Sequence, residues 1–321
     1  MVLRPLPLTR TDRLPAELMA QVLDNTKDDT QTLHACCLVC SAWHSYLIDS
    51  LYETIHLESR SQLDKLARAA LIYPAVRGRL ALSRSVILEQ GNLRTPGFAH
   101  VFPLVLGPHL HKVQDLTLDG CFELPLHLSF FIMLPQLKNV KHLHLFGTTP
   151  ESFADLRRII CAFPQLEELD IVGLKRPSWN ASQPTPLHVL NLRRAPKLTC
   201  VRASDSKPES FRDLVAWLSS SGVCSTIRRL DISLHPSSRL WTGLQILNAA
   251  LGHMTSNLEH LRIHIPREGT HSLLHVHSHC HIACRRIRRP LVFRSVLAPP
   301  RARHHTLGQH HVDKRSSVGI S

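Results

Sequence analysis

A leucine pattern that returns along the chain constrains its fold more than any other feature. Six segments fit aliphatic-x-x-Leu-x-aliphatic: residues 113–118, 140–145, 166–171, 187–192, 227–232 and 258–263. Their central leucines are Leu116, Leu143, Leu169, Leu190, Leu230 and Leu261, which gives intervals of 27, 26, 21, 40 and 31 residues. Amphipathic helical patterns lie between later segments, at residues 152–163, 209–219 and 242–254. A strand, turn and helix repeated at this period bury their apolar faces by stacking on neighbouring copies.

This pattern resembles the leucine-rich repeat over about residues 113–265. The asparagine that usually follows the strand in that family is absent, and Gly120, Gly147 and Gly173 stand near its position. We therefore expect glycine to form these turns. The interval of 40 residues indicates an insertion or a degenerate repeat near residues 197–203. The resemblance implies an α/β solenoid, with an ordinary α/β domain containing coincident leucines as the alternative.

The residues beside each central leucine form the candidate target-binding face. Alternate side chains of a strand point to opposite faces, so these residues are expected on the concave side of the array. They are Asp115, Thr117, His142, His144, Glu168, Asp170, Val189, Asn191, Arg229, Asp231, His260 and Arg262. The set is mixed in charge and rich in hydrogen-bonding groups, which favours a protein or peptide over a polyanion. The alternative is an exposed strand face without a ligand.

The N-terminal stretch from residue 14 to residue 57 predicts three short amphipathic helices with almost no linker between them. Pro15 fits the first turn of the first helix, and Asp28, Asp29 and Thr30 supply oxygens suited to capping the second. The stretch carries more apolar residues than the core of so small a unit uses. The excess predicts an apolar surface that binds a partner.

The motif in this stretch resembles the F-box. The matching residues are Leu14, Pro15, Glu17, Leu18, Val22, Leu23, Leu33, Ala35, Cys36, Leu38, Val39, Cys40 and Trp43. F-box proteins dock on the Skp-type adaptor of cullin-based ubiquitin ligases. The resemblance therefore implies an adaptor-binding site formed by Leu14, Pro15, Leu18, Val22, Leu33, Leu38, Val39 and Trp43. The alternative is a plain helical N-terminal subdomain.

Three features argue against an enzyme, a secreted protein and a membrane protein: the motifs, the cysteine content and the apolar runs of the sequence. The sequence contains no phosphate loop, nucleophile elbow or zinc-protease motif, so we expect no catalytic residue and no cofactor. Cys37, Cys40 and His44 have a superficial metal-ligand spacing, but the cysteines fall on an apolar stripe, which favours core packing over a metal site. Nine cysteines, an odd number, fit reduced thiols in the cytoplasm and/or nucleus. No signal sequence is expected, and prolines interrupt the longest apolar runs.

The C-terminal stretch differs from the rest of the chain. Residues 267–321 contain ten Lys or Arg and two acidic residues, so they hold eight of the thirteen net positive charges. Nine of the 23 histidines also fall here, and no helical or strand periodicity is present. We predict a disordered basic tail. Its His and Cys residues favour adventitious metal binding at most. The basic cluster Arg285–Arg289 suggests a nuclear signal or a phosphate-binding patch, and the alternative is a solvated tail without a dedicated partner.

The expected organisation has five parts. These are a flexible N-terminus (1–12), the F-box (13–57), a transition (58–110), the leucine-rich-repeat-like domain (111–265) and a disordered His/Arg-rich tail (266–321). The predicted function is that of a non-enzymatic substrate receptor of a cullin-based ligase, binding the Skp-type adaptor and an unknown target protein. The alternatives are an adaptor-binding scaffold without a role in degradation, and a nucleic-acid-binding protein that uses the basic tail.

Overall fold

The fold is known from a computed structural model, which describes residues 16–26, 29–90, 97–121, 126–173, 196–206, 208–234, 251–252 and 257–264. The helices are α1 (Ala16–Asp24), α2 (Thr30–Cys37), α3 (Ser41–Leu51), α4 (Arg60–Ile72), α5 (Pro74–Leu80), α6 (Phe102–Val105), α7 (Leu128–Met133), α8 (Phe153–Cys161) and α9 (Pro208–Ser220). The strands are β1 (Thr54–Leu57), β2 (Ser85–Glu89), β3 (Asp115–Asp119), β4 (His142–Phe146), β5 (Glu168–Val172), β6 (Cys200–Ser206), β7 (Arg229–Leu234) and β8 (His260–His264). The 3₁₀ turns are η2 (Gly107–His109), η3 (Leu134–Gln136) and η4 (Val223–Thr226).

Helices α1, α2 and α3 share a small core of their own. Its buried members are Leu23, Leu33, Cys37 and Leu47, and Met19, Cys36, Trp43 and Leu51 pack against them. Asp29 caps α2, as predicted, by accepting a hydrogen bond from Gln31 N at 3.0 Å. The hydroxyl of Thr32 also donates to the Asp29 carboxylate and lowers the pKa of that group. Three short helices thus form one unit around four buried side chains.

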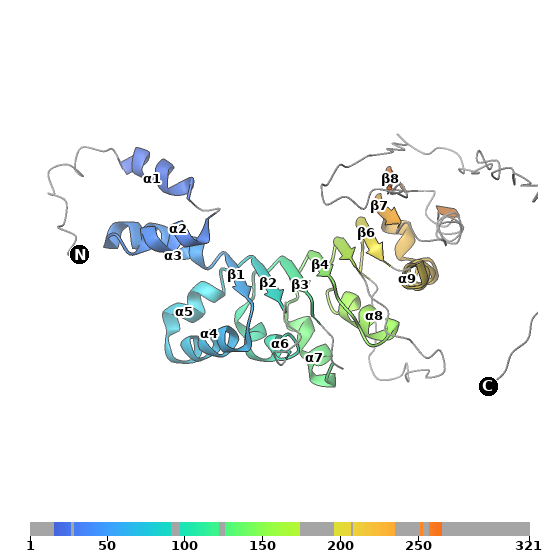
Figure 1. The fold of residues 1–321 in the computed structure, drawn as a ribbon, viewed down its shortest axis with the longest axis horizontal. Helices are drawn as coiled ribbons and strands as arrows, with labels where there is room; N and C mark the ends of the chain where they lie inside the picture. Colours follow the sequence, from blue (N-terminus) through green and yellow to red (C-terminus); the bar gives the residue numbers. More distant parts are fainter. Residues whose placement is uncertain are drawn as a thin grey trace, which may run out of the picture. The chain divides into compact units, whose positions relative to one another are not determined.

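The eight strands form one parallel sheet in the order in which they occur along the chain, from β1 to β8. Each strand pairs with the next, and the register places Leu116 beside Leu143, and Leu143 beside Leu169. Figure 1 shows helices α4, α6, α7 and α8 along one side of the row of strands. The result is a parallel sheet with these helices along one side.

Burial alternates along the strands because one face is covered and the other is open. In β3, β4 and β5 the second and fourth residues are buried and the other three are half-buried. The central buried row consists of Ile55, Val86, Leu116, Leu143, Leu169, Val201, Leu230 and Leu261. All eight belong to a continuous apolar core that also contains side chains of the helices. The predicted burial of the central leucines is confirmed for the five that the structure describes, and Leu190 lies outside the described residues.

Glycine forms the turns after three strands, as predicted. Gly120, Gly147 and Gly173 have φ values of +60°, +55° and +67°. The N–H of Gly120 donates to Phe146 O at 2.9 Å, and the N–H of Gly147 donates to Val172 O at 2.8 Å. A turn at positive φ thus satisfies the last carbonyl of the following strand.

The sheet begins earlier in the chain than we expected. Residues 58–110 were expected to be a transition, but they contain β2, and β1 lies within the range expected for the F-box. Strand β1 pairs in register with β2, and β2 pairs in register with β3. Their central residues are Ile55 and Val86, so a search for leucine at that position misses them.

The strand that follows β5 in the sheet also differs from the prediction. Its place is taken by β6, with Val201 at the centre, and residues 187–192 lie outside the described residues. With Val201 in this row, the intervals between central residues range from 26 to 32 from Ile55 to Leu261. The predicted intervals of 21 and 40 residues therefore arose because Leu190 was taken as the central residue of this strand.

None of the described helices is long and apolar enough to cross a membrane. The seven cysteines among the described residues are free thiols. Residues 265–321, where we expected a disordered tail, lie outside the described residues.

Candidate functional site

Helices α1 and α2 expose apolar side chains that their own core does not use. Leu18 and Val22 lie one turn apart on α1 with exposed fractions of 48% and 59%. Leu38 and Val39 follow the end of α2 and are 74% and 62% exposed. We call these four residues the N-terminal apolar surface. Leu14 and Pro15, which we also predicted for adaptor binding, lie outside the described residues.

The two remaining residues of the predicted adaptor site lie against the core. Leu33 is 2% exposed, so it is a core residue, and the expectation that it contacts a partner is wrong. Trp43 is half-buried and packs against the four-residue core of α1–α3. The sequence pattern could not separate the two kinds of position, because both are apolar and both belong to short helices.

Ten of the predicted target-binding residues lie on the open face of the sheet. One row contains Asp115, His142, Glu168 and Arg229, and the next contains Thr117, His144, Asp170, Asp231 and Arg262. Arg229 and Arg262 are exposed and the other seven are half-buried. His260 extends the first row and is exposed. Val189 and Asn191 lie outside the described residues.

Histidine and aspartate side chains on this open face meet across neighbouring strands. His142 of β4 contacts Asp115 of β3, and His144 Nδ1 of β4 lies 3.5 Å from Asp170 Oδ2 of β5. His144 also stacks on Phe146, with ring centroids 6.1 Å apart. Such cross-strand pairs are the units that stabilise the exposed face of a sheet. They also fix the side chains in one arrangement that a partner could recognise.

Arg202 is a residue of this face that the sequence analysis missed. Its guanidinium joins three strands, because Nη2 lies 3.3 Å from Glu168 Oε2 of β5 and Nε lies 3.8 Å from Asp231 Oδ2 of β7. The signal that could have found β6 is a Pro-x-Leu triplet that precedes both β5 and β6. Pro196-Lys197-Leu198 precedes β6 as Pro164-Gln165-Leu166 precedes β5.

The environment of Arg202 favours its charge. Burial opposes that charge, but neighbouring Cys200, Glu168, Asp170 and Asp231 outweigh burial and raise the pKa of Arg202. Burial raises the pKa of the Cys200 thiol, which is thus held as a neutral group beside the ion pairs. The centre of the open face therefore carries a fixed positive group between acidic ones.

Potential metal ligands gather at the β1 end of the sheet. His56, Glu58 and Glu89 each offer a ligand atom within 4.8 Å of the others, in the one such group found among the described residues. His56 Nε2 lies 3.1 Å from Glu89 Oε2, and His56 Nδ1 lies 3.6 Å from Glu58 Oε1. Both ring nitrogens thus face carboxylates, and the contact with Glu89 is at hydrogen-bond distance.

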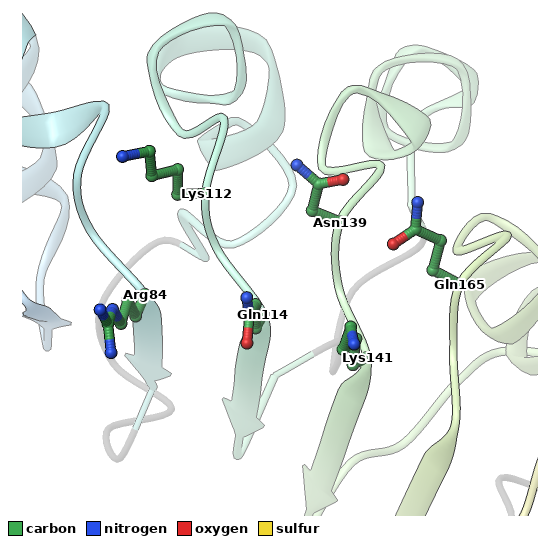
Figure 2. Close-up of a pocket in the computed structure, with 6 residues that line it drawn as sticks. All are labelled: Arg84, Lys112, Gln114, Asn139, Lys141 and Gln165. Carbon is green, nitrogen blue, oxygen red and sulfur yellow. The ribbon is translucent and has the colours of Figure 1, made fainter.

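A pocket of about 490 Å³ lies at the edge of the sheet where strands β2 to β5 begin. Its lining residues are Arg84, Lys112, Gln114, Asn139, Lys141 and Gln165. Figure 2 shows Arg84, Gln114 and Lys141 at the starts of their strands, and the other three on the segments that lead into strands. No residue of this pocket was predicted as a site residue.

Comparison with known families concerns the N-terminal part of the chain. Residues 11–58 match the family model described as F-box-like. This match confirms the resemblance inferred from the sequence, and it covers α1, α2, α3 and β1. No match is found among the curated proteins.

Proposed function

Because residues 11–58 of this chain form an F-box-like domain, we propose that the protein is the substrate-recognition subunit of an SCF-type ubiquitin ligase. F-box domains generally bind Skp-type adaptors, and the domain implies an adaptor role in such complexes. The observation that carries the proposal is the N-terminal apolar surface of Leu18, Val22, Leu38 and Val39. Four exposed aliphatic side chains on a domain with its own core are a surface built for a protein partner.

The sheet supplies the second half of the proposal. We interpret it as an irregular leucine-rich-repeat array, because its central residues recur every 26 to 32 positions in neighbouring strands. In this proposal the open face binds the target protein, and the chain itself catalyses no reaction. The proposed location is the cytoplasm and/or nucleus, which agrees with the free thiols of the described residues.

A pair of matched double variants tests adaptor binding. Leu38→Asp/Val39→Asp places two charges on the N-terminal apolar surface. The control Leu71→Asp/Ile72→Asp changes two residues at the end of α4 with similar exposure, 74% and 65%. We expect the first variant to lose co-purification with a recombinant Skp-type adaptor and the control to retain it. Equal binding by both variants, with unchanged thermal unfolding, would contradict the proposal.

A second experiment separates a substrate receptor from a scaffold. Wild type and a His144→Ala/Asp170→Ala variant are purified from cells under proteasome inhibition, and the bound proteins are identified by mass spectrometry. If the protein is a receptor, wild type and variant both retain the adaptor, but the variant no longer binds at least one protein that accumulates on wild type under proteasome inhibition. A scaffold shows no protein that depends on both the open face and proteasome inhibition.

The nucleic-acid-binding alternative makes a different prediction about salt. Phosphate contacts weaken steeply with salt concentration, whereas contacts between aliphatic side chains do not. Binding to the adaptor should therefore persist at about 0.5 M salt, where the Debye length is under about 5 Å. If the protein binds nucleic acid at low salt and releases it at about 0.5 M salt, the nucleic-acid binding would be assigned to exposed basic residues.

A further inference from the structure

The pocket at the start of strands β2 to β5 is built from equivalent positions in successive units of the sheet. Arg84, Gln114 and Lys141 each precede the first residue of a strand, namely Ser85, Asp115 and His142. Lys112, Asn139 and Gln165 come two residues before the corresponding positions (Figure 2). Neighbouring strands are about 4.8 Å apart, so Arg84 and Lys141 stand about 10 Å apart with Gln114 between them.

The main-chain N–H groups at the starts of β3 and β4 are already hydrogen-bonded to the neighbouring strand segment. Arg84 O accepts hydrogen bonds from Gln114 N and Asp115 N at 2.8 and 3.1 Å. Gln114 O accepts from Lys141 N and His142 N at 2.8 and 2.9 Å. The side chains that line the pocket are three cations and three carboxamides, and one of these carboxamides, Asn139 Nδ2, already donates a hydrogen bond to His111 O. Among the described residues that line it there is no carboxylate.

The cations of the pocket are available to a ligand. Arg84 Nη1 lies 3.8 Å from Glu53 Oε1, and these side chains are 70% and 52% exposed. Lys141 Nζ lies 3.4 Å from Glu167 Oε1, and these side chains are 38% and 49% exposed. Exposed pairs of this kind contribute little and exchange readily. Lys112 is exposed and forms no ion pair within the part of the chain that the structure describes.

The open face of the sheet contrasts with this edge. There the half-buried side chains of His142, His144 and Arg202 each face a carboxylate of a neighbouring strand. An anion at these positions must displace the paired carboxylates, whereas an anion in the pocket meets Lys112 directly. Exposed Arg229 and Arg262 lie on β7 and β8 of the open face, so the contrast concerns strands β3 to β6.

We infer that this pocket binds a phosphate monoester. Lysine and arginine supply charge-assisted hydrogen bonds to phosphate oxygens, and carboxamide N–H groups supply neutral ones. One phosphate group occupies only a small part of about 490 Å³, so the space also accommodates the group that the phosphate esterifies. The ester could be a phosphorylated side chain of a protein or a free phosphorylated metabolite. This inference goes beyond the proposed function, because it does not depend on the N-terminal apolar surface.

The test compares two double variants of the full chain that lose the same charge. Lys112→Gln/Lys141→Gln changes the pocket, and Lys65→Gln/Arg68→Gln changes two exposed residues of α4. Both proteins keep every other basic residue, so binding of anions elsewhere affects them equally. Affinity for inorganic phosphate, a phosphoserine peptide and glucose 6-phosphate is measured by titration calorimetry, with thermal unfolding as a check of folding.

We expect the pocket variant to bind each phosphate probe at least about tenfold more weakly than the α4 variant, which is the loss of one or two charge-assisted hydrogen bonds. If the phosphoserine peptide binds more strongly than both its unphosphorylated form and glucose 6-phosphate, the ligand is a phosphorylated protein. If glucose 6-phosphate binds more strongly than the phosphoserine peptide, the ligand is a metabolite. Equal affinities of the two double variants would overturn the inference. So would sulfate competing as well as either ester, because the site would then be a general anion surface.

Discussion

The main-chain carbonyl oxygen of Gln90 lies so close to Gly120 that a β-carbon at residue 120 would approach it to 2.8 Å. Gly120 also has φ of +60°, a conformation that other residues adopt only with strain. Two independent constraints, one from the backbone and one from the neighbouring unit, thus require glycine at this turn. This turn follows β3.

Gly120→Ala should therefore destabilise the protein by more than about 1 kcal/mol, the cost of positive φ for an L-residue, plus the cost of moving the Gln90 carbonyl. Gly78→Ala is the matched control, because Gly78 lies in α5 with open space around its Cα. That change should stabilise the protein by about 0.5–1 kcal/mol, since glycine weakens helices. Chemical denaturation of both variants would measure the difference, and equal effects would show that the turn is not constrained.

Leu143 and Thr117 provide opposite predictions for the two faces of the sheet. Leu143 is fully buried in β4, and Leu143→Ala should cost about 2–5 kcal/mol of unfolding free energy. Thr117 is half-buried on the open face of β3, and Thr117→Ala should cost less than about 0.5 kcal/mol. Denaturant unfolding of the two variants distinguishes the faces. Similar costs would mean that the strand register is wrong.

Asp119 gives the stability of the sheet a component that depends on pH. Burial, and to a smaller extent the nearby Glu89, raise the pKa of Asp119 above its ordinary value of 3.8. Between the ordinary and the raised value the folded protein binds more protons than the unfolded chain. This contribution to stability is complete below the ordinary pKa and is lost as the pH rises through the raised one.

Asp119→Asn removes that component. The unfolding free energy of the variant, measured relative to wild type, should therefore increase as the pH rises from about 4 to 7. Differences between the two proteins at each pH cancel the titration of groups that the mutation leaves unchanged. A difference that stayed constant, or that shrank with rising pH, would contradict the raised pKa.

Cysteine reactivity should separate buried thiols from exposed ones. Burial raises the pKa of Cys121 to about 12 and the pKa of Cys161 to about 11, so few of these thiols are ionised at pH 8. Cys40 is exposed at the start of α3. Iodoacetamide at pH 8, followed by peptide mass spectrometry, should modify Cys40 well before the other two. Denaturant should remove the difference, and early modification of Cys121 would refute its burial.

Local patterns determined much of this protein. The cap at Asp29, the glycine turns after β3, β4 and β5, and the burial of Leu116, Leu143 and Leu169 were all predictable from neighbouring residues. Each depends on interactions within a few positions, or on an alternation that one strand displays by itself. The F-box-like domain was recognisable for the same reason, because its motif lies in one continuous stretch.

Tertiary structure alone decided which segment occupies each place in the sheet. Val201 rather than Leu190 stands beside Leu169. A strand at this place must pair with both β5 and β7, and this requirement, not the match to a leucine motif, selects the segment. The same pairing brings Arg202 between Glu168 and Asp231, and it gathers Arg84, Lys112 and Lys141 around one pocket. These groups are distant in sequence and share no motif. Their proximity follows from the parallel register, which depends on packing that no single segment contains.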